Sequence, residues 1–298
     1  MRREALSGFA VDLGGTKLTV ARIDRGQVVE IRTEATNRSG TLAMQIDHMG
    51  RLLADLRFGP GACLGVAVTG LVSSDGIWSA VNADTLPAIK SAPLRDALIE
   101  RFGGVTCCND ALAATVAEAR FGAGQGCRDF AYMTVSTGIG GGLVLNGAPV
   151  TGGRGFAGHF GFTTSHNAST PCGSGREGTV EANASGMAIA RRAAELGHRG
   201  LSAKDVFAEA AMGAAWADQL VAQSARCVAK LIGDIAAMVD PERIAIGGSI
   251  GLAPGYLDRV KSCLNEEPAM FRVPVSLAAL GQEGPLLGAL AMSSLCRT

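Results

Sequence analysis

The sequence has no net charge, because 27 lysines and arginines balance 27 aspartates and glutamates among its 298 residues. A chain without an excess of one sign has no general attraction for nucleic acid or for an anionic membrane surface. Charged residues are also scarce, at 18%, whereas apolar residues reach 47%. This balance excludes a disordered chain and supplies enough apolar side chains for the cores of two domains.

Localisation signals are also missing. The few apolar residues before Asp12 cannot form the apolar segment of a secretory signal peptide. The longest uncharged run, 130–153, contains many glycines and several polar residues, so it predicts a glycine-broken β-hairpin rather than a membrane span. The eight cysteines are scattered, without the spacing of a disulfide framework. We therefore expect a cytoplasmic protein with reduced thiols and no membrane partner.

Glycine, by contrast, is abundant: the chain has 41, about twice the usual share. Many stand in doublets and triplets, where a backbone turns sharply or approaches a ligand closely. Alternating strand and helix patterns predict an α/β protein. Expected strands lie at 8–11, 18–23, 28–31, 64–68, 105–108, 143–145 and 243–246, and expected helices at 42–56, 91–102, 111–121, 183–196, 203–211, 214–239 and 285–295.

One unit of strand, glycine loop, strand and turn occurs twice. The first copy runs from Phe9 to Gly26 and the second from Phe130 to Gly147, a separation of 17 positions in each. The second glycine loop is expected over 138–142. The repetition predicts two duplicated domains that face each other across a cleft.

The first glycine loop, 12–17, reads Asp-Leu-Gly-Gly-Thr-Lys between two expected strands. Its amides could form a nest for an anion, and Asp12 could hold a hydrated Mg²⁺. A plain tight hairpin would need the same glycines. The motif is not a Walker loop, because a strand follows it and the order is Gly-Thr-Lys. The second loop repeats the chemistry, and the pair favours nucleotide binding.

Two further segments leave alternatives open. Asn109 and Asp110 stand where an expected strand ends and a helix begins, so they fit either an N-cap or a general base with a neighbouring hydroxyl ligand. The glycines at 153–158 match the dinucleotide fingerprint by letters, but no helix follows, so we discard that reading. His159, just beyond, fits a substrate contact or a structural role.

Motifs along nearly the whole chain resemble the ROK family of sugar kinases and repressors, within the actin-like ATPase (ribonuclease H-like) superfold. In particular, the chain is similar to the branch that phosphorylates N-acetylmannosamine at O6 in sialic acid catabolism, and His159 replaces a glutamate of most family glucokinases. The expected first strand starts by Gly8, which disfavours a repressor with an N-terminal DNA-binding domain. The matching segments are 12–17, 109–111, 136–142, 157–161, 181–186 and 246–249, with branch-specific likeness at 247–257 and 266–269.

The resemblance implies two duplicated α/β lobes around a cleft, at 1–109 and 110–298, with the helix at 285–298 packing back on the first lobe. It implies an ATP-dependent kinase, with Mg²⁺, an amino-sugar substrate and a homodimer. The implied catalytic base is Asp110. The implied sugar-binding residues are Gly70, Asn82, Asn109, Asp110, His159 and Glu181, and the implied ATP- and Mg²⁺-binding residues are Asp12, Gly14, Gly15, Thr16, Lys17, Thr137, Gly138, Gly140, Gly247 and Gly248.

The chain departs from the family at its zinc loop. Where the family has one histidine and three cysteines, the aligned residues are Phe162, Cys172, Ser174 and Thr179. A structural zinc needs four closed ligands, so we predict no structural zinc, with His166 the one alternative ligand nearby. Two other functions stay open at this stage: a glucokinase-like kinase for another hexose, and a sugar-sensing protein without catalysis.

Overall fold

The structure, a computed structural model, describes residues 2–82, 85–165 and 170–295. The chain divides into two compact units. This division differs from the expected boundary after residue 109, because helix α3 (Asp110–Phe121) packs against helix α10 (Gly284–Leu295) within the first unit. The first unit comprises Met1–Gly126, Ala148–Gly158 and Leu280–Thr298, and the second comprises Cys127–Gly147 and His159–Ala279.

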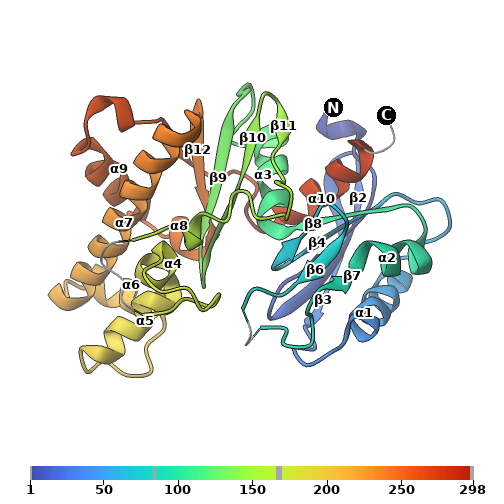
Figure 1. The fold of residues 1–298 in the computed structure, drawn as a ribbon, viewed down its shortest axis with the longest axis horizontal. Helices are drawn as coiled ribbons and strands as arrows, with labels where there is room; N and C mark the ends of the chain where they lie inside the picture. Colours follow the sequence, from blue (N-terminus) through green and yellow to red (C-terminus); the bar gives the residue numbers. More distant parts are fainter. Residues whose placement is uncertain (1, 83–84, 166–169, 296–298) are drawn as a thin grey trace. The chain divides into compact units, whose positions relative to one another are not determined.

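The first unit is built on a five-stranded sheet of order β3-β2-β1-β4-β8 (Figure 1). The central strand β1 pairs antiparallel with β2 and parallel with β4, and β4 pairs parallel with β8. The carboxyl ends of the three parallel strands therefore lie at one edge of the sheet. The strands are β1 (Gly8–Leu13), β2 (Lys17–Asp24), β3 (Gln27–Ala35), β4 (Leu64–Val68) and β8 (Val105–Asn109).

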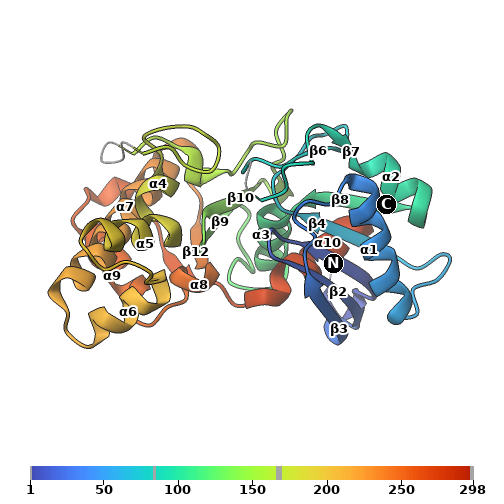
Figure 2. The same cartoon turned by 90° about the horizontal axis from the view of Figure 1, so that it is seen from below.

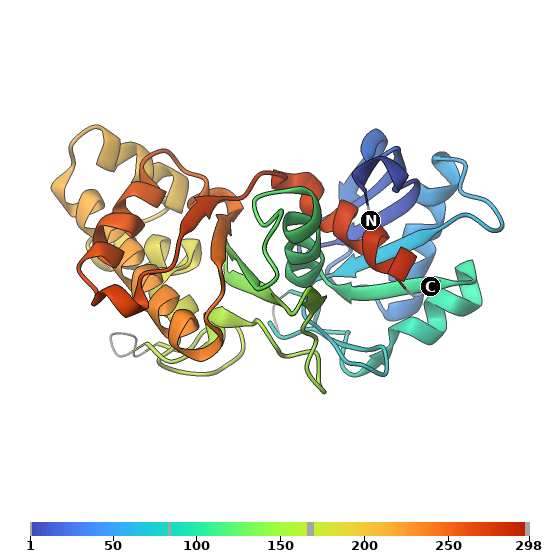
Figure 3. The same ribbon diagram turned by 90° about the horizontal axis from the view of Figure 1, so that it is seen from above.

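Successive side chains of β1 point to opposite faces of the sheet, and each face packs against a different pair of helices. Phe9, Val11 and Leu13 belong to the core with helices α1 (Leu42–Asp55) and α2 (Leu94–Phe102), which lie together on one side of the sheet (Figures 1 and 2). Ala10 belongs to the core with α3 and α10, two helices that lie side by side (Figure 3). Because the period of a strand is two, Asp12 shares the face of Ala10.

The expected strands and helices of this unit are confirmed, with adjusted ends. Thr41 caps α1 by accepting a hydrogen bond from Met44 N, as predicted. The helix expected at 91–102 begins instead at Leu94, because Ser91 has a left-handed φ of 50° and residues 92–93 pair as strand β7. The elements that the sequence did not predict are short: β5 (Leu71–Val72), β6 (Ile77–Ser79), β7 (Ala92–Pro93), η1 (Arg3–Ala5) and η4 (Gly281–Glu283).

The second unit repeats the strand order of the first, which confirms the duplication. Strand β9 pairs antiparallel with β10 and parallel with β12, and β12 pairs parallel with β13. The expected hairpin is present, but β10 begins at Ile139, so the glycines at 140–142 lie in a strand rather than in a loop. The strands of this unit are β9 (Phe130–Val135), β10 (Ile139–Leu145), β12 (Arg243–Gly247) and β13 (Val275–Leu277). The short strand β11 (Ala148–Pro149), next in the sequence after β10, is grouped with the first unit.

The helices of the second unit gather on one side of β9, β10 and β12 (Figure 2). The prediction of a single helix over 183–196 is wrong. Ser185 is extended, with φ −71° and ψ 167°, and its side chain caps a new helix by accepting a hydrogen bond from Ala188 N. Within the described residues, no helix is both long and apolar enough to span a membrane. The helices are α4 (Val180–Ala184), α5 (Gly186–Glu195), α6 (Ala203–Ala211), α7 (Ala215–Val239), α8 (Gly248–Gly251), α9 (Tyr256–Asn265), η2 (Phe160–Phe162) and η3 (Ala269–Phe271).

Candidate active site

The first half of the site lies at the carboxyl edge of the first unit's sheet. Asp12 stands one residue before the end of β1, and Asn109 ends β8 in register with Val68 of β4. Asn109 Nδ2 donates to the carbonyl of Gly70 at 2.8 Å, and Gly70 has a left-handed φ of 94°. Three parallel strand ends thus bring Asp12, Gly70 and the Asn109–Asp110 pair to one edge.

Asn109 is the N-cap of α3, because its Oδ1 accepts from Leu112 N at 3.0 Å. The capping interpretation is therefore correct, and it leaves the side chain of Asp110 at the first position of the helix. Asp110 Oδ1 accepts from Ala111 N at 2.8 Å and from Asn109 Nδ2 at 2.9 Å. Burial raises the pKa of Asp110 to about 6, against these two hydrogen bonds, which lower it. Such a carboxylate is ionised at neutral pH and still basic enough to accept a proton.

Asp12 has the features of a cation ligand. Its Oδ1 is buried and has no hydrogen-bond partner within the described part of the chain. Burial, and secondarily the charge of Asp110, raise the pKa of Asp12 to about 7. An unsatisfied buried carboxylate oxygen beside a second carboxylate is a costly arrangement that a divalent cation would relieve. The residues therefore fit Mg²⁺.

Two carbonyls of the first glycine loop are bound by one residue, Thr36. Its hydroxyl donates to Gly14 O at 2.8 Å, and its amide donates to Thr16 O at 3.0 Å. The amides of Gly15 and Thr16 make no hydrogen bond within the described residues. A loop with engaged carbonyls and open amides can cradle an anion. Lys17 is the first residue of β2 and is exposed.

The second loop has the same polarity. The amides of Gly186 and Met187 donate to the carbonyls of Ser136 and Thr137, at 2.8 and 3.2 Å. The amides of Thr137 and Gly138 make no hydrogen bond within the described residues. In each of the two duplicated loops, therefore, two backbone amides have no partner within the described residues and could bind an anion, as the amides of phosphate loops do. The predicted ligand Gly140 lies further along, in β10, where it pairs with Thr134.

Glu181 lies against the second loop. Its Oε2 accepts from Ile139 N at 2.9 Å, and a β-carbon added at Gly138 would lie 2.5 Å from the same oxygen. Glu181 is 9% exposed, and burial raises the pKa of its carboxyl group. Glu181 thus lies beside the candidate phosphate loop of the second unit, and Asp12 stands at the start of the loop of the first unit.

The remaining predicted residues are His159, Asn82, Gly247 and Gly248. The ring of His159 stacks on that of Phe162, with centroids 5.9 Å apart and planes at 18°. Asn82 lies in a turn, where its carbonyl accepts from Thr85 N at 3.0 Å. At Gly247 and Gly248, added β-carbons would meet Tyr132 Oη, 2.6 Å away, and the carbonyl of Val135, so strand β9 already explains both glycines. A contact of these two glycines with adenosine stays a prediction.

Three of the four zinc-loop positions make hydrogen bonds with one another or with Arg176, and the fourth caps a helix. Cys172 Sγ lies 2.9 Å from Ser174 Oγ, and Thr179 Oγ1 accepts from Ala182 N at 3.1 Å to cap α4. Arg176 donates to Phe162 O at 2.6 Å and to the hydroxyl of Thr164 at 3.0 Å. The part of the chain that the structure describes has no group of three or more histidine, cysteine or acidic residues that could hold a metal ion. His166 lies outside the described residues, and the absence of zinc stays a prediction.

A model of the ROK family matches residues 8–294. The chain belongs to the ROK family. It is 39% identical over 285 residues to a protein of Citrobacter koseri named N-acetylmannosamine kinase, over 95% of this chain and 97% of the relative. The solved structure of a ROK hexokinase from Thermus thermophilus superposes with a TM-score of 0.84 at 30% identity, covering 98% of this chain and 99% of the other.

A further solved structure is a ROK family glucokinase from Streptomyces griseus in complex with glucose and AMPPNP. It has a TM-score of 0.82 and 27% identity, and covers 97% of this chain and 99% of the other. The ROK chain thus has the actin-like ATPase fold, and it is an ATP-dependent sugar kinase that takes a sugar and ATP as its small-molecule partners.

Several residues that shape this ROK site gave no signal in the sequence. Thr36 is separated by 20 residues or more from the two carbonyls it binds, and the side chain of Arg176 by 12 or more from its two acceptors. Ser249 stands in a segment that matches the family, 246–249, but its contact with Ser136, whose hydroxyl lies 3.0 Å from its own, joins residues more than 100 positions apart. A periodic or motif pattern cannot reveal contacts across such separations. Their roles follow only from the folded chain.

Proposed function

We propose that this kinase transfers the γ-phosphoryl group of ATP to O6 of N-acetyl-D-mannosamine. The observation that carries the choice of sugar is the likeness, at 37–39% identity over 94–95% of the chain, to proteins named N-acetylmannosamine kinase. His159, in place of a glutamate of the glucokinases, agrees with a sugar other than glucose.

Asp110 is the proposed general base. In this mechanism the O6–H proton passes to its carboxylate, a bond forms between O6 and the γ-phosphorus, and the bond from that phosphorus to the ADP oxygen breaks. The Asn109 cap fixes the orientation of Asp110 through the hydrogen bond to Oδ1. The carbonyl of Gly70 fixes Asn109 in turn. We assign sugar hydroxyl contacts to Asn109, His159 and Glu181, with Gly70 and Asn82 nearby.

The open amides of the two glycine loops are the proposed phosphate ligands, from Gly15 and Thr16 in one unit and Thr137 and Gly138 in the other. The amide of Gly14, which the resemblance also implied, donates instead to Lys17 O at 2.9 Å. Asp12 would hold Mg²⁺, which when bound neutralises charge on the phosphates. Its open Oδ1 supports this assignment.

A kinase for another hexose is the second candidate. The observation in its favour is that the two superposed structures are a hexokinase and a glucokinase. Purified protein with ATP, Mg²⁺ and a panel of sugars separates the two candidates when ADP release is recorded. The panel is N-acetyl-D-mannosamine, N-acetyl-D-glucosamine, D-glucose and D-mannose.

We expect the largest kcat/KM for N-acetyl-D-mannosamine, by about 10-fold or more over glucose, a difference of ~1.4 kcal/mol. A larger value for glucose would replace the proposed substrate and leave the kinase mechanism intact. Location of the product phosphate by phosphorus NMR tests the O6 position.

A further inference from the structure

Helix α4, which carries Glu181, is bound at its C-terminal end by three side chains from outside it. Arg191, Arg192 and Ser224 donate to the successive carbonyls of residues 182–184, at 2.9, 3.0 and 2.7 Å. The last carbonyls of a helix have no partner within the helix. Helix α4 has only five residues, and these donors bind three of its last four carbonyl oxygens. They therefore determine where α4 lies.

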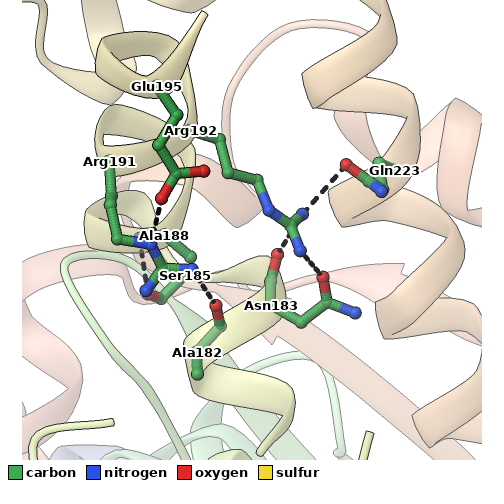
Figure 4. A network of polar contacts seen from close by, with 8 residues as sticks. All are labelled: Ala182, Asn183, Ser185, Ala188, Arg191, Arg192, Glu195 and Gln223. Carbon is green, nitrogen blue, oxygen red and sulfur yellow. Dashed lines mark hydrogen bonds and ion pairs between the residues drawn. The ribbon is translucent and has the colours of Figure 1, made fainter. Parts of the chain in front are cut away.

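Arg192 makes the most contacts of the three (Figure 4). Besides the carbonyl of Asn183, its guanidinium binds Asn183 Oδ1 and donates to Gln223 Oε1 at 2.9 Å. Asn183 is 2% exposed, and its Nδ2 donates to Ser165 Oγ at 2.9 Å. Both ends of the Asn183 amide are thus held, one by α5 and one by the segment after η2. A buried side chain held at both ends fixes the rotation of α4 about its axis.

Glu181 and Asn183 lie on opposite sides of α4, because two residues correspond to about 200° of helix rotation. While Asn183 binds Arg192, Glu181 binds Ile139 N at the second glycine loop. A rotation that follows the loss of the Asn183 contact would therefore move the Glu181 carboxylate directly. The hydrogen bonds that the carboxylate accepts from the backbone of Ile139 and Gly173 would have to resist it.

We propose that Arg192 is a positioning residue for sugar binding, acting through Asn183 and α4 to hold the carboxylate of Glu181. The inference rests on the proposed sugar contact of Glu181. It assigns no contact between Arg192 and either substrate. The planar guanidinium binds two acceptors of Asn183 and one of Gln223, a set that a lysine ammonium on a flexible stem cannot match.

The test compares Arg192→Gln with the wild type in steady-state kinetics. We expect the KM for N-acetyl-D-mannosamine to rise about 10-fold, while the KM for ATP changes less than about 2-fold. Arg192→Lys should lie between the two proteins. Arg226→Gln is the matched control, because Arg226 is an exposed arginine on α7, and its KM values should equal those of the wild type.

A double-mutant cycle separates positioning from stability. If Arg192 acts through Glu181, Arg192→Gln should weaken sugar binding less than 2-fold when Glu181→Ala is already present, measured by calorimetry where turnover is too slow. An equal loss in both backgrounds would overturn the proposal. Asn183→Ala removes the same link and should reproduce the effect, so it replaces Arg192→Gln if that variant does not fold.

The substrate assignment is tested apart from this inference. If the wild type prefers D-glucose in the panel, the cycle is run with D-glucose. If the preferred sugar differs but the two substitutions are still coupled, only the proposed substrate is contradicted. If the losses from Arg192→Gln and Glu181→Ala are additive, only the role of Arg192 is contradicted.

Discussion

At the scale of single residues, the two aspartates of the first unit differ in environment. Asp110 has two hydrogen bonds to Oδ1, whereas Asp12 has a buried oxygen with no partner within the described residues. The hydrogen bonds keep the pKa of Asp110 at about 6, below the value of about 7 for Asp12. These environments fit a base that is ionised at neutral pH and a ligand that needs a cation.

Replacement of the proposed base gives the first prediction. Asp110→Asn keeps an oxygen acceptor for Ala111 N, so the start of α3 should remain intact. Without a proton acceptor, kcat should fall roughly 10²-fold or more, while the KM for the sugar changes little. ADP release measured at pH 7.5 provides the test. Turnover near that of the wild type would exclude Asp110 as the base.

The buried Asp12 predicts a pH-dependent stability. Its pKa of about 7 in the folded protein exceeds the ordinary value of 3.8, so the folded state binds the proton more tightly than the unfolded state. The stability of the metal-free protein should therefore fall as the pH rises from about 4 to about 7. Asp12→Asn has no carboxyl group to ionise, so it does not lose stability in this way. At pH 8 the variant should be more stable than the wild type by about 2–4 kcal/mol.

Urea unfolding in EDTA at pH 4.5 and pH 8 measures the effect of Asp12→Asn. The difference between the two proteins should shrink at the lower pH, and Mg²⁺ should stabilise the wild type but not the variant at pH 8. Equal stabilities at both pH values would contradict the assignment of Asp12 as a buried carboxylate.

At the scale of elements, the second glycine loop and α4 form one structure. A β-carbon at Gly138 would lie 2.5 Å from Glu181 Oε2, so Gly138→Ala should displace the proposed sugar contact as well as a phosphate amide. We expect its KM to rise about 10-fold or more for both substrates. At Gly14, in the first loop, the nearest atom would be Lys17 O at 3.4 Å, an ordinary contact. Gly14→Ala should leave the sugar KM within about 2-fold.

The kinetics of these two variants distinguish the loops. Equal sugar KM values for Gly138→Ala and the wild type would show that Glu181 is not a sugar ligand held by the second loop.

The packing of α10 on α3 is a second coupling between elements. A β-carbon at Gly288 would meet the backbone carbonyl of Ala113, which cannot move without moving α3 and Asp110 at its start. Gly288→Ala should destabilise the protein by about 1–3 kcal/mol and lower kcat. Gly284→Ala is the control, since its nearest neighbour would be Ala114 Cβ at 3.6 Å. Urea unfolding that gives equal midpoints for the two variants would contradict this packing.

At the scale of the whole molecule, two units of equal strand order each supply one glycine loop and acidic groups beside it. Duplication explains why the same chemistry appears twice, since a repeated strand, loop and strand places its amides alike in both copies. The additions to each copy differ. In the first unit α3 supplies Asp110, and in the second α4 supplies Glu181.

The zinc prediction concerns the protein as a whole. Hydrogen bonds from Arg176 reach Phe162, one of the three positions where a family zinc ligand is replaced, and the nearby Thr164. Elemental analysis of protein purified without added metal should find far less than one zinc per chain. Its melting temperature should not change with EDTA. One tightly held zinc per chain would refute the prediction.

The sequence alone determined the duplicated hairpins, most strand and helix positions, and the residues of both loops. These features depend on local preferences, such as glycine at turns, the period of two along β1 and the capping side chain of Thr41. Such preferences act within a few residues, so they can be read without the fold. The departure at the zinc-ligand positions was visible only against the pattern of the family that the chain resembles.

Only the tertiary structure decided where α4 ends and which side chains hold it. An apolar stripe over 183–196 predicts one helix, but Ser185 caps a second, and Arg191, Arg192 and Ser224 satisfy the end of the first. It also decided that Thr36 binds the first loop and that the strand face with Ala10 packs against α3 and α10. Hydrogen bonds between residues distant in sequence outweighed local propensity there, because a buried polar group costs more free energy unpaired than a break in a helix does.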